Sequence, residues 1–239
     1  MIEFPESYTM ANQIREHLIG KIVSEVIVLQ TPHKFAFFWG DKDEYPELLE
    51  GKKITGATNH GGMLQIELED VILVLADGAY PKYYDEIKKF PKKSQLFLHF
   101  DDDTALSISV QMYGVMGACK MSECQDGYYI SSSTKPSILS DDFSYDYFKG
   151  LYDGVKSRRL SAKAFLATEQ RIPGLGNGVL QDILYQAGLH PKCQIASFTE
   201  EELCKLYDVV RDTIVYTNKI YTENGKTFHY LCDFLYYSP

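Results

Sequence analysis

The hydrophobic pattern of the chain changes once, near residue 135, and this change limits the possible folds more than any other feature. Before it, short apolar runs rich in β-branched and aromatic residues alternate with turn residues, which is typical of strands. We expect strands at Ile22–Leu29, Lys34–Phe38, Lys53–Thr58, Met63–Leu68, Val71–Ala76, Leu96–Phe100 and Ala105–Val110. A short helix precedes them, with Pro5 and Glu6 at its start and Gly20 as its stop. The pattern predicts an antiparallel β-sandwich or barrel behind a leading helix.

After residue 140, apolar residues recur at helical spacing from Phe148 to Val155, behind a predicted N-cap at Ser144. A capping box formed by Thr199 and Glu202 predicts the start of another helix. The only linker-like stretch lies just before this part, at residues 131–136. We therefore expect an α+β protein with an N-terminal two-layer antiparallel β-sandwich domain at residues 1–135 and a helical domain at residues 136–239.

Length and composition are those of a globular protein without a membrane segment. The chain has 239 residues, and its apolar runs, such as Val71–Ala76, are much shorter than a membrane span. Glu3, Pro5 and Glu6 interrupt the N-terminal stretch that a signal peptide would need. The five cysteines, at positions 119, 124, 193, 204 and 232, fit neither a disulfide framework nor a metal site. We expect free thiols, a cytoplasmic location, and no metal or cofactor.

Charge is the main obstacle to a nucleic-acid partner. The net charge is −9, whereas proteins that bind DNA normally neutralise phosphates with lysine and arginine. Residues 150–192 nevertheless hold six basic residues against three acidic ones. This basic segment is either an anion-binding site or the solvated face of a helix, and composition does not separate the two.

The most specific passage of the sequence runs from Arg171 to Pro191. Asn177 is predicted to cap a helix that ends at Gly188. Ahead of this helix, Gly174 and Gly176 predict a tight turn with exposed backbone N–H groups. Donors that converge at a helix N-terminus bind phosphate well, and the Asn177 side chain would add a contact. A purely structural turn is the alternative.

Ile172 to Pro191 resembles the helix-two-turns-helix motif of the formamidopyrimidine-DNA glycosylase and endonuclease VIII family. The start of the chain, Met1-Ile2-Glu3-Phe4-Pro5-Glu6, is similar to the Met-Pro-Glu-Leu-Pro-Glu with which members begin. Residues 139–143 also resemble the family's entrance to its helical domain. The resemblance implies a two-layer β-sandwich followed by a helical domain, with double-stranded DNA in the cleft between them.

The resemblance also implies base-excision repair. In the family, the N-terminal amine attacks C1′ of a nucleoside with an oxidised base, expels the base, and forms a Schiff base from which the strand is cleaved. An α-amino group has a pKa of about 7.7–8.0, well below that of lysine, and so suits this role. Glu3 matches the general acid and base on the sugar, and Glu6 matches a second glutamate that organises the site. Two solvated acids at a helix start are the alternative.

The sequence departs from the family pattern at the nucleophile. Ile2 stands where members have proline. If Met1 is removed, Ile2 supplies a primary amine. If Met1 stays, the amine is displaced by one residue, about 3.8 Å along the chain.

Other family features change or are missing. The phosphate-binding lysine falls on Gly62, where His60 is either a substitute donor or a turn residue. Met112 and Tyr113 stand where members carry the side chains that fill the gap left by the everted base, and they are either a wedge or part of the core. The two Cys-x-x-Cys pairs of the family's zinc finger do not occur in this sequence.

The resemblance thus predicts a DNA glycosylase with AP lyase activity that acts on damaged or abasic double-stranded DNA as a monomer, without membrane association. The predicted catalytic residues are Ile2, Glu3 and Glu6. The predicted DNA contacts are Asn177, Gly174, Gly176, Arg171, Lys163, Arg159, His60, Met112 and Tyr113. A non-catalytic binder of damaged DNA is the first alternative, and a metabolic or scaffold protein, favoured by the acidic charge, is the second.

Overall fold

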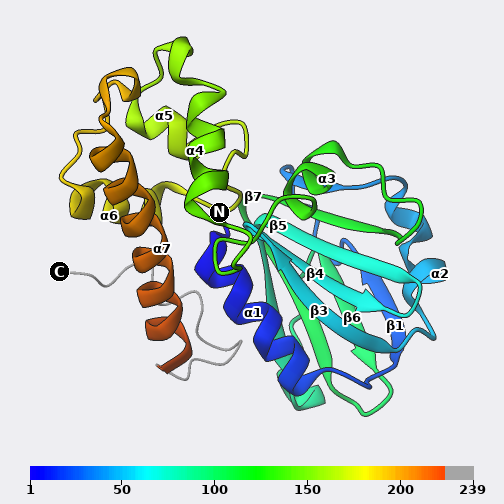
Figure 1. Cartoon of the computed structure of the whole chain (residues 1–239). Coiled ribbons are helices and arrows are strands. Elements are labelled where there is room, and N and C mark those ends of the chain that lie inside the picture. Colours follow the sequence, from blue (N-terminus) through cyan, green and yellow to red (C-terminus); the bar gives the residue numbers. More distant parts are fainter. Residues whose placement is uncertain (224–239) are drawn as a thin grey trace.

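The computed structural model describes residues 1–223, so the thiol at Cys232 and the end of the proposed helical domain lie outside the described residues. The first part contains α1 (Phe4–His17), β1 (Val23–Val28), β2 (Ala36–Phe38), α2 (Tyr45–Leu49), β3 (Ile54–His60), β4 (Met63–Leu68), β5 (Val71–Tyr84), β6 (Leu96–Phe100), β7 (Ala105–Lys120) and α3 (Gly127–Ser133). The second part contains α4 (Tyr145–Asp153), α5 (Ala162–Ala167), α6 (Asn177–Ala187) and α7 (Glu200–Glu223). Four short 3₁₀ turns occur at Lys42–Glu44, Ile87–Lys89, Lys156–Arg158 and Ile195–Ser197. Figure 1 shows the sheet and the helical bundle as two bodies with the chain start between them.

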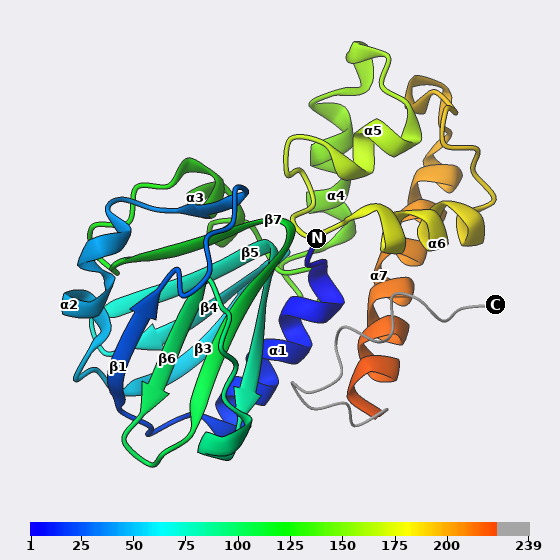
Figure 2. The ribbon, with the colours of Figure 1, turned by 180° about the vertical axis from the view of Figure 1, so that it is seen from behind.

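The strands form one continuous sheet in the order β1-β6-β7-β5-β4-β3. This sheet bends back on itself, and a bridge between Ile22 and Lys53 joins its two edges. The two expected layers are therefore halves of one hydrogen-bonded sheet (Figure 2). The strand pairing is antiparallel, as expected, except that β2 pairs in parallel with β7, with Ala36 opposite Gly114. The prediction of a wholly antiparallel sheet was wrong for this strand.

The predicted bounds of β4 and β6 are confirmed, whereas β5 and β7 run well past their predicted ends at Ala76 and Val110. The two long strands pair with each other from end to end, and β5 carries a bulge between Asp77 and Ala79. A Cβ atom at Gly78 would lie 2.2 Å from the Gln111 carbonyl oxygen, so only glycine allows this approach. In the sequence Gly78 looks like a turn residue, but in the structure it allows two backbone segments to come into close contact.

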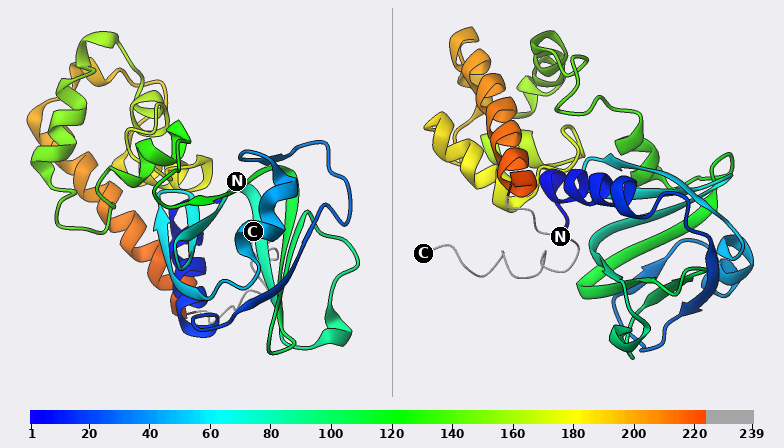
Figure 3. Two further views of the ribbon diagram at one scale, coloured as in Figure 1. Left: turned by 90° about the vertical axis from the view of Figure 1, so that its right-hand side faces the viewer. Right: turned by 90° about the horizontal axis from the view of Figure 1, so that it is seen from below.

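Helix α1 forms as predicted and belongs to two hydrophobic cores. The helix starts with a capping box. The Glu3 side chain accepts a hydrogen bond from the Glu6 backbone, and the Glu6 side chain accepts one from the Glu3 backbone. Met10 and Ile14 are buried in the core of the sheet, whereas Phe4 is buried in the core of the helical part. Figure 3 shows the last turns of α7 beside α1, and the two helices are in contact, so α1 joins the two parts of the molecule.

The helical part is built around a second core, which includes Ile138, Phe148, Ile183 and Val210 besides Phe4. The predicted N-cap is confirmed, because Ser144 accepts a hydrogen bond from the Tyr147 N–H group at 3.2 Å. The capping box at the start of α7 is also present. Among residues 1–223, no helix combines the length and the hydropathy that crossing a bilayer requires.

Candidate functional site at the chain start

The chain start lies in the seam between the sheet and the helical part. The Ile2 N–H group donates to the Asp77 carbonyl oxygen at 2.5 Å, and the Phe4 N–H group donates to the Gly174 carbonyl oxygen at 2.9 Å. The first bond fixes the chain to the bulge of β5, and the second fixes it to the turn before α6. The Ile2 side chain is only 2% exposed and belongs to the core of the sheet. The backbone at the chain start is therefore held from both sides.

The Glu3 carboxylate lies at the N-terminus of α6. Its two oxygens accept hydrogen bonds from the Gly178 and Val179 N–H groups, each at 2.9 Å. The prediction that Asn177 caps this helix was wrong: Gly176 is the N-cap, Asn177 is the first helical residue, and its side chain makes no capping bond. A carboxylate distant in sequence supplies the negative charge that a helix N-terminus favours.

The glycines before α6 are explained by this arrangement. A Cβ atom at Gly176 would lie 2.4 Å from the Glu3 carboxyl carbon. The turn between β3 and β4 approaches from the other side, where a Cβ atom at Gly61 would lie 2.4 Å from the Pro173 Cβ atom. At Gly62, a Cβ atom would lie 2.6 Å from the Ile2 carbonyl oxygen. A lysine at position 62 would therefore press on the chain start, which gives a steric reason for its absence here.

Glu6 is buried beside Glu3. One of its carboxyl oxygens accepts a hydrogen bond from the Glu3 N–H group at 2.8 Å. Burial raises the pKa of Glu6 to about 7, and the negative charge of Glu3 acts in the same direction. Burial also raises the pKa of Tyr221 on α7 to about 12, with smaller contributions from the charges of Glu6 and Glu3. Glu3 and Glu6 therefore share a partly buried environment next to both α1 and α7.

The raised pKa of Glu6 makes stability depend on pH. In the unfolded chain Glu6 ionises near 4.5, and in the folded protein near 7, so the folded state binds more protons between these values. The free energy of unfolding should therefore fall, by about 3 kcal/mol, as the pH rises through this window. Glu6→Gln should remove this decrease. Urea unfolding from pH 4.5 to 8 measures it, with the exposed Glu16→Gln as control, and parallel curves for wild type and Glu6→Gln would contradict it.

A small cavity adjoins the chain start, and three of its lining residues carry functional groups that the sequence prediction missed. They are Asp77, Tyr128 and Gln170, which line it together with Met1 and Ile2. Burial raises the pKa of Asp77, and the positive charge of the nearby α-amino group opposes this effect. The feature of the sequence that could have indicated the bulge of β5 is the Asp77-Gly78 pair, which interrupts a strand-like run.

Two of the predicted DNA contacts already have partners within the protein. The buried Arg171 guanidinium donates to the carbonyl oxygens of Ala164 and Phe165 at 2.8 and 2.9 Å, and so closes the end of α5. The His60 imidazole lies 3.1 Å from Gln65 and against a tyrosine ring of α3. Burial lowers the pKa of His60. These contacts give both side chains a structural role.

Five of the other predicted contacts are exposed, whereas Gly176 is buried and Gly174 is half-buried. Lys163 and Arg159 are exposed at and before the start of α5, and Asn177 is exposed beside Glu3. Met112 is 80% exposed and has a φ of +62°, an unusual value for an unbranched side chain. Tyr113 is also exposed. The alternative that places Met112 and Tyr113 in the core was therefore wrong.

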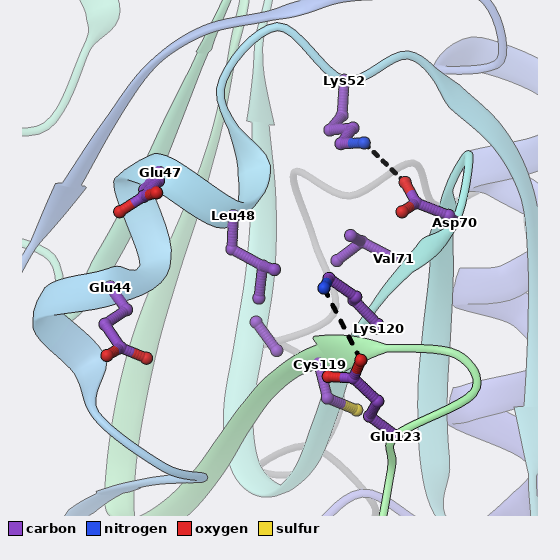
Figure 4. Close-up of a pocket in the computed structure, with 10 residues that line it drawn as sticks. Glu44, Glu47, Leu48, Lys52, Asp70, Val71, Cys119, Lys120 and Glu123 are labelled. Atoms are coloured by element: carbon purple, nitrogen blue, oxygen red, sulfur yellow. Dashed lines mark hydrogen bonds and ion pairs between the residues drawn. The ribbon is translucent and has the colours of Figure 1, made fainter.

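A larger cavity lies elsewhere, between α2, the start of β5 and the end of β7. Its volume is about 570 Å³. Figure 4 shows its mixed charges, in which Lys52 pairs with Asp70 and Lys120 pairs with Glu123. No lining residue of this cavity belongs to the chain start or to α6. The candidate site therefore remains at the seam.

The protein combines a bent sheet, a helical part with a glycine turn before α6, and a chain start held between them. These features define an α+β protein of the helix-two-turns-helix class. Residues 1–112 match the family model described as formamidopyrimidine-DNA glycosylase N-terminal domain. The formamidopyrimidine-DNA glycosylase of Streptococcus pneumoniae strain R6 is 26% identical over 231 residues, which cover 95% of this chain and 80% of that protein. That of Lactobacillus delbrueckii subsp. bulgaricus is 22% identical, with coverage of 96% and 81%.

Solved structures show the same fold. Formamidopyrimidine-DNA glycosylase of Lactococcus lactis, bound non-covalently to DNA containing an abasic site, has a TM-score of 0.78 and 19% identity, covering 93% of this chain and 85% of that one. The protein from Thermus thermophilus has a TM-score of 0.72 and 22% identity, covering 91% and 76%. The chain is thus similar to formamidopyrimidine-DNA glycosylases, in its first 112 residues by the family model and over nearly its whole length by sequence and fold.

Proposed function

We propose that this protein is a base-excision-repair DNA glycosylase with AP lyase activity, which acts on oxidised bases in double-stranded DNA. One observation carries the proposal: the chain start, Glu3, Glu6 and the glycine turn before α6 meet in one site. The relative from Lactococcus lactis binds abasic-site DNA, in agreement with this substrate class. We further propose a monomer in the cytoplasm and a division between the domains near residue 135.

The chain start supplies the nucleophile. In the sequence as it stands the α-amino group belongs to Met1, and removal of Met1 would transfer it to Ile2. The amine attacks C1′, the glycosidic bond breaks, and the base leaves with the bonding electron pair. The Glu3 carboxylate takes the proton that the attacking amine loses and passes it to the sugar ring oxygen, which assists ring opening. The Glu6 carboxyl group accepts a hydrogen bond from the Glu3 N–H group, so Glu6 is a positioning residue.

DNA contacts are assigned to exposed groups around this site. We assign a phosphate to the exposed Asn177 side chain beside the turn at Gly174 and Gly176, because the Gly178 and Val179 N–H groups of α6 already bind Glu3. Lys163 and Arg159 are assigned to the flanking backbone, because contacts to phosphates fix position without reading sequence. The exposed Met112, with Tyr113 beside it, is assigned to the base stack. Arg171 and His60 are left out because internal partners occupy them.

Borohydride trapping on abasic-site DNA tests the enzyme. The amine adds to the C1′ aldehyde and loses water to give an imine, and borohydride then delivers a hydride that fixes the C–N bond. We expect a covalent adduct whose peptide map places the DNA on the N-terminal residue, and intact mass shows whether this is Met1 or Ile2. Blocking the α-amino group by acetylation should abolish the adduct, while an adduct on a lysine would contradict the proposed nucleophile.

A non-catalytic binder of damaged DNA is the second candidate. Two observations favour it: Ile2 is buried in the core, and Gly62 has no side chain to hold a phosphate. The same experiment separates the two functions. Retained binding to abasic-site DNA with no adduct, even for protein with a free α-amino group, would favour the binder and overturn the enzyme.

A further inference from the structure

The outer face of the sheet carries exposed aromatic rings next to the candidate site. We define the aromatic strip as Phe35, Phe37, Tyr113 and Tyr128. Their exposed fractions are 46%, 50%, 45% and 47%, which is high for such large apolar side chains. Rings this exposed, gathered in one place, indicate a binding surface more often than a stability element.

Strand alternation explains why the rings point outward. In β2, Ala36 and Phe38 pack against the core of the sheet, so Phe35 and Phe37 on either side of Ala36 face the opposite way. β2 pairs in parallel with β7, with Phe37 opposite Val115. The Gly114 N–H group donates to the Phe35 carbonyl oxygen at 3.0 Å, so Tyr113, the residue before Gly114, lies next to Phe35.

The strip continues into the cavity at the chain start. Tyr128 lines that cavity together with Met1 and Asp77. Burial raises the pKa of Tyr128, and the negative charge of Asp77 acts in the same direction. Gly114 pairs with both Asp77 and Ala36, so Tyr113 and Phe35 lie next to the backbone that holds Ile2.

The chemistry of the strip suits unpaired nucleobases. Aromatic rings bind bases of any sequence by stacking, and the Lys34 ammonium lies 5.3 Å from the centre of the Phe35 ring, where it can meet a phosphate. With a net charge of −9, this chain has little capacity for binding through phosphates alone. Stacking supplies affinity that does not depend on releasing counterions.

We propose that the aromatic strip binds the unpaired bases of a DNA strand next to the site, by stacking on Phe35 and Phe37. The inference rests on the proposed function for the nature of the ligand, and it extends that function to DNA with an unpaired segment around the lesion. Such substrates should be bound more tightly than fully paired DNA of the same sequence.

Binding of undamaged oligonucleotides tests the strip without any need for catalysis. The probes are a fluorescent single strand of about 15 nucleotides, within the range that one single-strand-binding fold covers, and its duplex. Fluorescence anisotropy should show the single strand bound about tenfold less tightly for each ring replaced in Phe35→Leu/Phe37→Leu. Leucine keeps the apolar surface and removes the stacking face. Ile87→Ala, at an exposed apolar residue outside the strip, is the matched control.

Salt dependence distinguishes stacking from phosphate contacts. The slope of log K against log salt should be the same in the leucine variant and the wild type, because no ion pair is removed. Affinity within twofold of wild type, or a slope that falls together with the affinity, would overturn the inference. Failure of borohydride trapping with intact single-strand binding would instead overturn the proposed function and leave the strip in place.

Discussion

Glu3→Gln is expected to reduce base excision by about 100- to 10,000-fold, the range that general acid–base catalysis contributes. The amide cannot supply a proton to the sugar ring oxygen. It also presents only one acceptor to the two N–H groups of Gly178 and Val179, which the carboxylate now binds with both oxygens. Single-turnover excision of an oxidised base measures the loss. The exposed Glu16→Gln, on the same helix, serves as control.

The structural role of Glu3 has to be separated from its chemical role. Loss of the charge at the N-terminus of α6 should cost about 1 kcal/mol of unfolding free energy, which leaves the protein folded. Urea unfolding and binding of abasic-site DNA should therefore stay near wild type. Excision within a few-fold of wild type would show that Glu3 only caps the helix.

Gly174→Ala should have the largest effect on stability. At a φ of +84° a side chain costs about 1 kcal/mol. In addition, its Cβ atom would lie 2.5 Å from the carbonyl carbon of Gly61, so the two turns must separate at a cost of about 1–3 kcal/mol. We expect a loss of about 2–4 kcal/mol in urea unfolding. Gly188→Ala is the matched control, because it has a φ of +69° with open space around it.

The same substitution should also impair catalysis. The Gly174 carbonyl oxygen accepts the Phe4 N–H group, so a shifted turn moves the residues at the chain start. A displacement of about 1 Å at a reacting group is enough for a 100-fold loss of rate. Gly188→Ala should retain wild-type excision. If Gly174→Ala matched Gly188→Ala in both stability and rate, the contact between the two turns would have no importance for the site.

The sequence predicted the features that depend on local patterns. The strand bounds of β4 and β6, the cap at Ser144 and the box at Thr199 follow from residues within a few positions of each other. The ends of β5 were missed because Gly78 allows contact between backbones that are remote in sequence. Local patterns contain no information about such contacts.

The candidate site was only partly predictable for the same reason. The family resemblance selected Glu3, but the partners of its carboxylate are 175 and 176 residues away. The position of Arg171, at the head of a glycine-rich turn, suggested a phosphate ligand, whereas the fold buries it against carbonyl groups of α5. Asp77 was not selected because a single acid inside an apolar run gives no sign of what lies opposite it.

Helix α1 contributes to both cores and lies against α7, which has a consequence for how the protein is made. A ribosome releases Glu3 and Glu6 well before α7, so these two residues are made long before the helix that completes their surroundings. Nascent chains that stop short of Tyr221 have the reactive groups without the environment that tunes them. The surroundings of Glu3 and Glu6 are therefore complete only after α7 has been synthesised.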